Sequence, residues 1–385
     1  MDKIDELLTR GVVNIIHGKA ELEKVLKSGK KLNVYLGIDP TATKIHLGHA
    51  VLLRKLQQFV ELGHRVTFLI GDFTALIGDT SDKDSERPVL TYEQIQENFQ
   101  TYKSQAEKIL DFSQVTVRHN SEWLKKLNFE EILKLTRHFS LNDFISRELI
   151  KKRLAEGKSV SIPEVLYPVM QGYDSYFMDT DLQIGGTDQT FNMQAGRTLQ
   201  KDLRNKESFI MSNPFLTGTD GRKMSKSWGN AIWLDDSPND MYGKVMSIKD
   251  DLIQEYFVLG TSLSMSNIQS SMSNQNPMDQ KKSLAFQVVS ELHNETKAKS
   301  AQEYFESTFQ QKIIPSNIQE FELTKTSSIL VALVDTGLAK SGAESRRLIR
   351  QNGVRINGET MNLESYEPKS GDVISVGSRK FIKLK

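Results

Sequence analysis

The stretch from residue 33 to residue 70 reads NVYLGIDPTATKIHLGHAVLLRKLQQFVELGHRVTFLI. Residues 33–38 and 65–70 are apolar runs that predict buried strands, and residues 45–62 repeat apolar side chains at helical spacing. A strand, a helix and a second strand in close succession predict a parallel sheet with a right-handed crossover. The same alternation returns later, with strands predicted at 115–118, 182–184 and 208–211 and a helix at 188–200. We therefore predict an α/β fold built on an open parallel sheet.

The segments around this sheet have other patterns. Residues 4–28 carry apolar positions at helical spacing, interrupted by two glycines, and predict two short helices. Residues 85–179 are mostly helical in pattern, which we interpret as an insertion into the sheet domain. A helical pattern from 241 to 322 is interrupted by the polar tract 262–277, for which we predict a surface loop. From residue 323 onward, short helices give way to β runs at 353–356, 373–376 and 381–384.

Composition excludes several classes of protein. The 385 residues are 38% hydrophobic and carry a formal net charge of +1, so the whole chain is not a polycation that coats nucleic acid. Residues 323–385 are nevertheless basic, which predicts a polyanionic partner for this tail. The absence of cysteine excludes disulfides, thiolate metal sites and a cysteine nucleophile. With no apolar leader and no apolar run long enough to cross a bilayer, we predict a cytoplasmic protein without a membrane partner.

Two lysines and two hydroxyl side chains gather in the loop Lys223-Met224-Ser225-Lys226-Ser227, which has Gly221 before it and Gly229 after it. Ammonium groups on such a loop act as mobile point charges and can stabilise a polyphosphate as its charge redistributes. Taken alone, the pentapeptide also fits a solvated basic turn. The pairing with a second motif far upstream favours the phosphate-binding interpretation.

That upstream motif is His46-Leu47-Gly48-His49, at the start of the predicted helix. Histidines three residues apart share one face of the first turn, where backbone N–H groups favour phosphate. Gly48 has no side chain, so the flat base of a nucleotide can approach the backbone at this position. A core or surface histidine pair is the alternative, and a metal site is a third one that lacks a nearby further ligand. There is no GxGxxG motif, and the stretch before Gly157-Lys158-Ser159 fails as a Walker loop because residue 152 is lysine.

A third cluster consists of Tyr167, Gln171 and Asp174, whose spacing puts them on one helix face. It could be only a polar stripe. The run 183–189, QIGGTDQ, follows it as a strand that enters a glycine turn and a helix. Because open parallel sheets bind ligands at the carboxyl ends of their strands, we expect this turn to meet Tyr35 and Asp39 in one crevice.

These motifs together resemble those of the bacterial-type tyrosyl-tRNA synthetases, a family of class I aminoacyl-tRNA synthetases. The resemblance rests on residues 35–41, 46–49, 77–79, 167–174, 185–189 and 223–227. Residues 339–350 and 354–358 resemble the RNA-binding domain named after the fourth small-subunit ribosomal protein. The resemblance implies three parts: a Rossmann-like catalytic domain over 1–220 with its helical insertion at about 85–179, a helical anticodon-side domain over 221–322, and a small α+β RNA-binding domain over 323–385.

The resemblance also implies roles for individual residues. It places the substrate phenol on Tyr35 and Asp174, and the α-amino group on Asp79, Tyr167 and Gln171. It implies that the remaining residues line the ribose and carboxylate side (Gln183, Gly186, Asp188, Gln189), contact ATP (Gly37, Asp39, Thr41, His46, Gly48, His49, Ser227), stabilise pyrophosphate (Lys83, Arg87, Lys223, Lys226), or bind RNA (Lys340, Arg346, Arg347, Arg350, Arg355). Leu36 stands where some relatives have a cysteine that contacts the ribose.

The reaction implied by the resemblance is ATP-dependent activation of L-tyrosine, followed by transfer of tyrosine to tRNA(Tyr). Mg²⁺ would neutralise phosphate oxygens, although the sequence shows no dedicated protein cage for it. Members of the family are homodimers whose insertion supplies the interface, and we expect the same here. Two alternatives are kept: a tryptophanyl-tRNA synthetase, and a non-catalytic paralogue that binds structured RNA.

Overall fold

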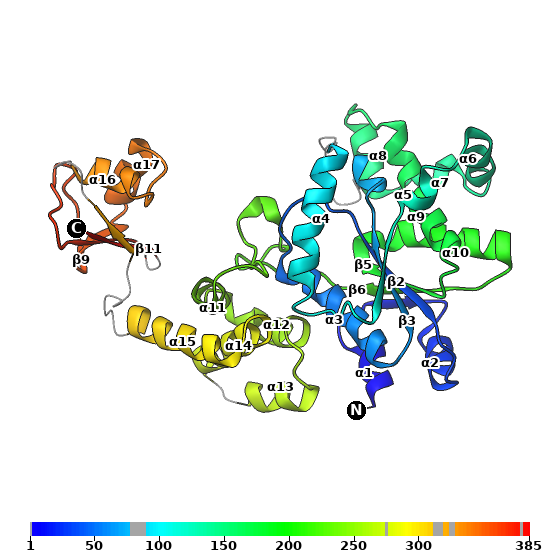
Figure 1. The fold of residues 1–385 in the computed structure, drawn as a ribbon, viewed down its shortest axis with the longest axis horizontal. Coiled ribbons are helices and arrows are strands. Elements are labelled where there is room, and N and C mark those ends of the chain that lie inside the picture. Colours follow the sequence, from blue (N-terminus) through cyan, green and yellow to red (C-terminus); the bar gives the residue numbers. More distant parts are fainter. Residues whose placement is uncertain (1, 78–89, 274–275, 311–318, 323–327, 378–379) are drawn as a thin grey trace. The chain divides into compact units, whose positions relative to one another are not determined.

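The computed structural model describes residues 2–77, 90–273, 276–310, 319–322, 328–377 and 380–385. The chain forms two compact units, Met1–Glu295 and Thr296–Lys385 (Figure 1). The predicted three-part division at residues 220 and 322 stays a prediction.

A six-stranded sheet is the centre of the first unit, with the strand order β1-β6-β5-β2-β3-β4. Five of its strands are parallel, namely β2 (Asn33–Ile38), β3 (Arg65–Ile70), β4 (Val115–His119), β5 (Leu182–Gly186) and β6 (Phe209–Asn213). The predicted strands are therefore confirmed, as is the α/β class. The edge strand β1 (Asn14–Ile16) is antiparallel to β6, and it lies in a segment for which only helices were predicted.

Helices cover the sheet and connect its strands (Figure 1). The crossover between β2 and β3 is α3 (Leu47–Glu61), which buries Leu53, Leu56 and Phe59 completely. Helix α9 (Ile162–Phe177) packs against α10 (Thr190–Arg204) so closely that a Cβ on Gly172 would lie 3.0 Å from the backbone of Ala195. The other helices between β3 and β5 are α4 (Tyr92–Ala106), α5 (Ser121–Leu124), α6 (Phe129–Thr136), α7 (Leu141–Ile145) and α8 (Glu148–Ala155).

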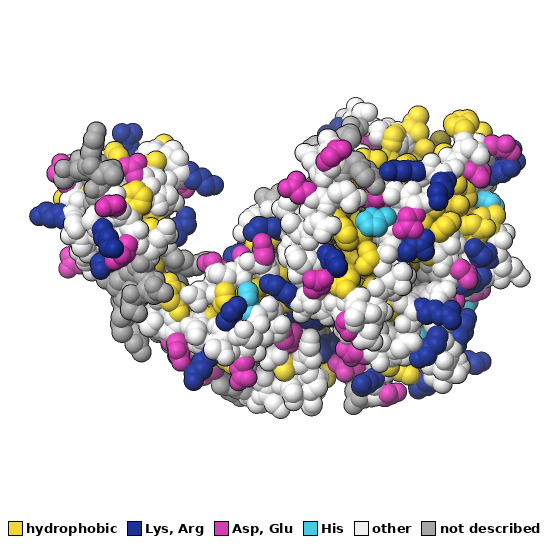
Figure 2. Space-filling model, in the orientation of Figure 1, with side chains coloured by type: hydrophobic (Ala, Val, Ile, Leu, Met, Phe, Trp, Pro, Cys, Tyr) yellow, Lys and Arg dark blue, Asp and Glu magenta, His cyan; other side chains and the backbone are white. Residues whose placement is uncertain are grey.

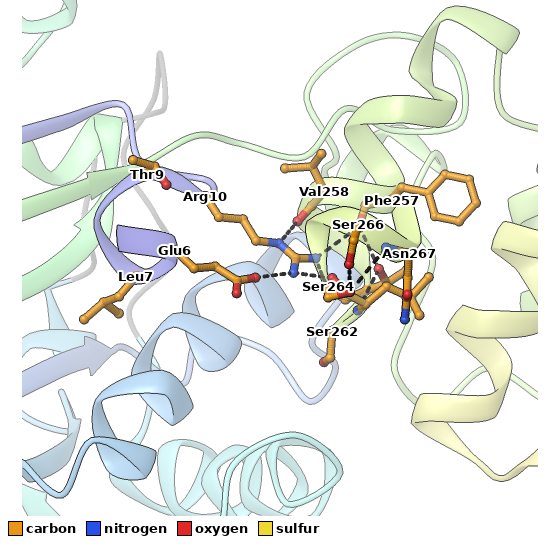
Figure 3. A network of polar contacts seen from close by, with 12 residues as sticks. Glu6, Leu7, Thr9, Arg10, Phe257, Val258, Ser262, Ser264, Ser266 and Asn267 are labelled. Carbon is orange, nitrogen blue, oxygen red and sulfur yellow. Dashed lines mark hydrogen bonds and ion pairs between the residues drawn. The ribbon is translucent and has the colours of Figure 1, made fainter. Parts of the chain in front are cut away.

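The N-terminal helices α1 (Lys3–Thr9) and α2 (Lys19–Lys27) confirm the predicted helix pair. Arg10 follows α1 and directs its guanidinium at the end of α12 (Ile253–Gly260), where it donates to the backbone oxygens of Val258 at 2.8 Å and Thr261 at 2.7 Å (Figure 3). These bonds satisfy carbonyls that a helix end leaves without partners. A second buried cation, Lys55, donates to the carbonyls of Leu7 and Arg10 at 2.8 Å each. Burial and the nearby Arg10 lower the pKa of Lys55 to about 7.

The end of the first unit is helical, with α11 (Pro238–Met246), α12, α13 (Met265–Met272) and α14 (Pro277–Leu292). The prediction of a surface loop over 262–277 is wrong, because α13 lies inside it. Ser264 caps this helix by accepting a hydrogen bond from the backbone N–H of Asn267, and Ile268 is buried. One cap and one apolar contact were enough to order a short helix of polar composition.

The second unit contains the five-stranded sheet β7-β11-β10-β8-β9 and two helices that share its core. The predicted strands correspond to β8 (Val354–Ile356), β10 (Val373–Val376) and β11 (Lys380–Leu384), whereas β7 (Gln319–Phe321) and β9 (Glu359–Thr360) were not predicted. The helices are α16 (Ile329–Asp335) and α17 (Gly342–Arg350), and α15 (Glu295–Phe305) precedes them. Among the residues described in the two units, no helix is both long enough and apolar enough to span a bilayer.

Candidate active site

A cavity of about 480 Å³ opens at the carboxyl ends of β2 and β5 and beside the start of α3. Its lining brings together most of the predicted site residues of the first unit: Tyr35, Gly37, Asp39, Thr41, His46, Gly48, His49, Tyr167, Gln171, Asp174, Gly186, Asp188, Gln189, Lys223 and Lys226. Asp79, Lys83 and Arg87 lie outside the described residues, as does the side chain of Ser227. The five predicted RNA-binding residues lie in the second unit.

Asp174 forms one end of the cavity, and only 2% of it is exposed. Its carboxylate accepts hydrogen bonds from Trp123 Nε1 at 2.7 Å and from Asn120 Nδ2 at 3.2 Å. The pKa of Asp174 is raised to about 8, mainly by burial, with a smaller contribution from the nearby Asp39 and Asp72, while the two donors oppose the shift. Such a carboxyl group is well placed to hold a hydroxyl group of a ligand, because water reaches it poorly.

Tyr35 lies beside Asp174 on β2 and donates its hydroxyl proton to Gln183 Oε1 at 3.1 Å. Burial, and then the proximity of Asp174, raise the pKa of Tyr35 well above its usual value, so the phenol stays protonated. Gln183 does not line the cavity. Its amide is fully buried and also donates to the carbonyl of Met193 at 2.9 Å, so in this structure it positions Tyr35.

Asp39 links the strand end to two neighbouring elements. It accepts hydrogen bonds from Tyr167 Oη at 2.7 Å and from Thr74 Oγ1 at 2.8 Å. Gly71 makes this approach feasible, because a Cβ there would lie 1.9 Å from Asp39 Oδ1.

Sequence reasoning missed four residues that shape this end of the cavity: Gly71, Thr74, Asn120 and Trp123. Gly71 and Thr74 come directly after β3, and Asn120 and Trp123 come directly after β4. The rule that ligands bind at the carboxyl ends of parallel strands was applied to β2 and β5, and its use on β3 and β4 would have found them.

A second group of residues that line the cavity consists of histidines and lysines. His46 is the N-cap of α3, and its backbone N–H donates to His49 Nδ1 at 3.2 Å. Burial, followed by the charge of Lys226, lowers the pKa of His46 to about 3, and burial together with His46 lowers that of His49 well below its usual value. Both imidazoles are therefore neutral near pH 7 and can hydrogen-bond to phosphate without carrying a positive charge.

The lysines of this group extend into the lining of the cavity from the loop after β6. Lys223 Nζ lies 3.5 Å from Asp188 Oδ2 and 3.7 Å from the centre of the Phe215 ring. Lys226 Nζ donates to Tyr102 Oη at 3.1 Å. The predicted pairing of histidine and lysine motifs is thus present in space, with the positive charge supplied by the lysines.

Residues that follow the lysine loop run alongside the histidine motif. Leu47 N–H donates to the carbonyl of Ile232 at 2.8 Å, and Leu234 N–H donates to the carbonyl of Ile45 at 3.0 Å. His46 and Trp233 form an antiparallel bridge between these bonds. The two motifs, distant in sequence, are therefore held together by backbone hydrogen bonds.

An open parallel sheet with these two motifs at its carboxyl edge is the arrangement of a class I aminoacyl-tRNA synthetase. Consistent with this, residues 27–310 match the family model of class I tRNA synthetases (W and Y), and residues 329–374 match the S4 domain. The chain is 41% identical to a tyrosine–tRNA ligase of Thermotoga maritima, covering 98% of this chain and 96% of that one. It is 42% identical to tyrosine–tRNA ligase 2 of Clostridium acetobutylicum, covering 100% and 99%. The chain belongs to the tyrosine–tRNA ligase family, as the sequence predicted.

Solved structures show the same fold at lower identity. A C-terminally truncated mitochondrial tyrosyl-tRNA synthetase of Aspergillus nidulans superposes with a TM-score of 0.67 at 23% identity, covering 80% of this chain and 94% of that one. The tyrosyl-tRNA synthetase of Archaeoglobus fulgidus, solved with L-tyrosine, gives a TM-score of 0.61 at 23% identity, covering 78% and 100%. These likenesses support the architecture of the first unit.

Proposed function

We propose that this chain joins L-tyrosine to the terminal adenosine of tRNA(Tyr) in two steps, using ATP. The observation that carries the proposal is the polarity of the cavity. A buried acid–phenol pair, Asp174 and Tyr35, forms one part of the lining, which we call the tyrosine end, and neutral histidines with two lysines form another part, which we call the phosphate end. A tyrosine fits the first end by its hydroxyl group, and the phosphates of ATP fit the second.

In the first step, the carboxylate of the bound tyrosine attacks the α-phosphorus of ATP. A carbon–oxygen–phosphorus linkage forms, the bond between the α-phosphorus and the bridging oxygen breaks, and pyrophosphate leaves with its electrons. Lys223 and Lys226 stabilise the charge on the leaving group, while His46 and His49 hydrogen-bond to the phosphates. Positioning and cationic stabilisation account for most of the rate in such transfers. In the second step, a hydroxyl group of the terminal adenosine attacks the tyrosyl carbonyl and AMP leaves.

Mg²⁺ is proposed to enter bound to the ATP phosphates. Among the residues that the structure describes, no group of three or more His, Asp or Glu side chains could hold a metal ion. The ion would neutralise phosphate oxygens, and we assign it no protein ligand.

The test is ATP–pyrophosphate exchange with purified protein, without tRNA, in the presence of tyrosine, tryptophan, phenylalanine or no amino acid. We expect exchange with tyrosine alone. Phenylalanine leaves buried polar groups unpaired, and tyrosyl-tRNA synthetases are themselves the reference example of this discrimination, at about 10⁵-fold. Exchange with tryptophan would favour the alternative substrate, and no exchange by the folded protein would favour the RNA-binding paralogue.

The second unit is proposed to contact the tRNA backbone. Arg346, Arg347 and Arg350 lie on α17, and their side chains are 59%, 63% and 74% exposed. Lys340 precedes this helix and Arg355 lies on β8. Replacing the three helix arginines by alanine should raise the KM for tRNA and reduce its salt dependence, while exchange without tRNA stays unchanged. An unaltered KM for tRNA would contradict this role.

We also propose that the protein is a cytoplasmic homodimer. Five large apolar side chains are exposed between residues 129 and 162, and Figure 2 shows hydrophobic side chains gathered over α6 to α8. Phe129 is 75% exposed and Ile162 is 74% exposed. An apolar surface of this kind on a helical insertion fits a second copy, as in the family resemblance. Replacing both residues by aspartate should halve the mass measured by light scattering, whereas a monomeric unmodified protein would contradict the proposal.

A further inference from the structure

The lysine loop is closed by the side chain of Asn230, which lies at its far end and is only 2% exposed. Asn230 Oδ1 accepts a hydrogen bond from the backbone N–H of Ser225 at 2.9 Å. Its Nδ2 group donates to the carbonyl of Lys223 at 3.1 Å and to Asp220 Oδ1 at 2.8 Å. One buried amide thus holds the backbone immediately before and after Met224, between the two lysines.

The space inside the loop fits this amide closely. A Cβ on Gly218 would lie 2.4 Å from Asn230 Nδ2, so the backbone of Gly218 packs directly against the amide. The backbone N–H of Thr219 donates to the carbonyl of Asn230 at 3.1 Å. Asn230 is therefore bonded to both sides of the loop through its side chain and its backbone.

Both ends of the loop are attached to fixed elements of the first unit. At the near end, Thr217 N–H donates to Glu255 Oε1 at 2.7 Å, and Tyr256 Oη donates to the carbonyl of Thr217 at 2.6 Å. Thr217 also forms an antiparallel bridge with Lys223. At the far end, Asn230 directly precedes the segment that pairs with the histidine motif.

We propose that Asn230 is a positioning residue for adenylate formation, which sets the places of Lys223 and Lys226 relative to His46 and His49. Asn230 is not among the residues that line the cavity, so we assign it no contact with substrate or ATP. It acts by fixing the backbone from which both lysines extend. A displacement of about 1 Å in such groups can cost on the order of 100-fold in rate. The inference rests on the proposed function and adds a residue that controls its first step.

The experiment measures ATP–pyrophosphate exchange and single-turnover adenylate formation for the full-length chain. The unmodified chain is measured first, and an inactive unmodified protein would refute the proposed function rather than this inference. With activity established, Asn230→Ala should lower kcat on the order of 100-fold while leaving the KM for tyrosine within about twofold, because other elements form the tyrosine end. A kcat within about threefold of the unmodified value would overturn the proposal.

Asn230→Asp separates hydrogen bonding from packing. Aspartate has nearly the same shape and keeps the acceptor for Ser225 N–H, but it replaces the donor and faces Asp220 and the carbonyl of Lys223. We expect this variant to be at least as slow as Asn230→Ala. Recovery of the unmodified rate by Asn230→Asp would show that only volume matters and would overturn the proposal. Arg222→Ala is the control in the same loop: it removes the ion pair with Asp220 and the contact with the Trp228 ring, and it keeps every atom to which Asn230 bonds.

A double-variant cycle tests whether Asn230 acts through the lysines. If it does, Asn230→Ala should slow a Lys226→Ala chain by less than about tenfold, because the group it positions has been partly removed. Full additivity of the two losses would contradict the positioning role. If Asn230→Ala does not fold, as judged by circular dichroism, Asn230→Ser replaces it in the cycle with the same expected outcomes.

Discussion

At the tyrosine end of the cavity, buried groups on strands and helices are held by side-chain hydrogen bonds, whereas at the phosphate end the charges sit on a loop. Asp174 is held by Asn120 and Trp123, which are both neutral hydrogen-bond donors. The positions of Lys223 and Lys226 depend on the backbone of their loop, which is hydrogen-bonded to the side chain of Asn230. We propose that the first end distinguishes ligands by the polar groups that a wrong ligand would leave unpaired, and that the second responds to charge that develops during the reaction.

The largest effect is expected at the tyrosine end. Asp174→Ala should lower kcat/KM for tyrosine on the order of 10³-fold, because the phenol loses its buried acceptor and Trp123 and Asn120 lose theirs. The KM for ATP should change little. Exchange assays measure both constants. The control is Asp251→Asn, which makes the corresponding change at an exposed aspartate. If the constant for ATP changed more than kcat/KM for tyrosine, the two ends of the cavity would not act independently.

Lys226→Ala should have the next largest effect, a fall in kcat on the order of 100-fold with the KM for tyrosine nearly unchanged. The lysine is expected to act mainly when pyrophosphate leaves, so ground-state binding of tyrosine does not depend on it. Single-turnover adenylate formation measures this step. Lys201→Ala, which removes an exposed lysine paired with Glu207, is the control. If Lys226→Ala instead raised the KM for tyrosine, the contrast between the ends would fail.

Per pH unit, the pKa of Asp174 predicts a smaller effect, this time on stability. In the folded protein without ligand the pKa of Asp174 is about 8, well above the usual value of an aspartate, so the folded state holds its proton more tightly than the unfolded state. The stability from this group is present below pH 4 and is lost as pH rises through 8. Relative to the unmodified chain, Asp174→Asn should therefore gain about 1 kcal/mol per pH unit across that window.

Urea unfolding at several pH values, followed by tryptophan fluorescence, measures this difference, since Trp123 lies against Asp174. Asp251→Asn should show no such trend. A difference between Asp174→Asn and the unmodified chain that stays constant with pH would contradict the raised pKa.

The smallest effect is expected from the histidines. The pKa of His46 is about 3, so the imidazole stays neutral from pH 5.5 to 7.5. His46→Gln should lower the rate constant of adenylate formation by a factor that is the same at every pH in this range. The rate constant of His46→Gln is divided by that of the unmodified chain, because the titration of ATP affects both in the same way. A ratio that changed around pH 6.5 would show that His46 gains a proton there.

The sequence predicted much of the fold because the parallel strands are continuous apolar runs. The bounds predicted for β2 and β3 agree with the structure. Strand β1 was missed because three residues with apolar neighbours fit a helix equally well, and only pairing with β6 makes them a strand. Helix α13 was missed because its polar composition is typical of loops, and its burial depends on Ile268 alone.

The candidate site was predicted where residues belong to motifs and missed where their role depends on the fold. His46 and Lys226 stand in short signatures. Trp123 lies on a four-residue helix and acquires a role only because α9 brings Asp174 to it. The same holds for Asn230, whose partners include the backbone atoms of Ser225 and Lys223, which no residue pattern reveals.

Strand β1 also has a consequence for how the molecule is made. Its residue Asn14 pairs with Ser212 on β6, so the two strands leave the ribosome far apart in time. Until β6 has emerged, β1 has no partner and the sheet has an open edge. Contacts between such distant residues slow folding, because a long loop must close before they form. Strand β1 is synthesised before the other strands of this sheet and is thus among the last of them to be paired.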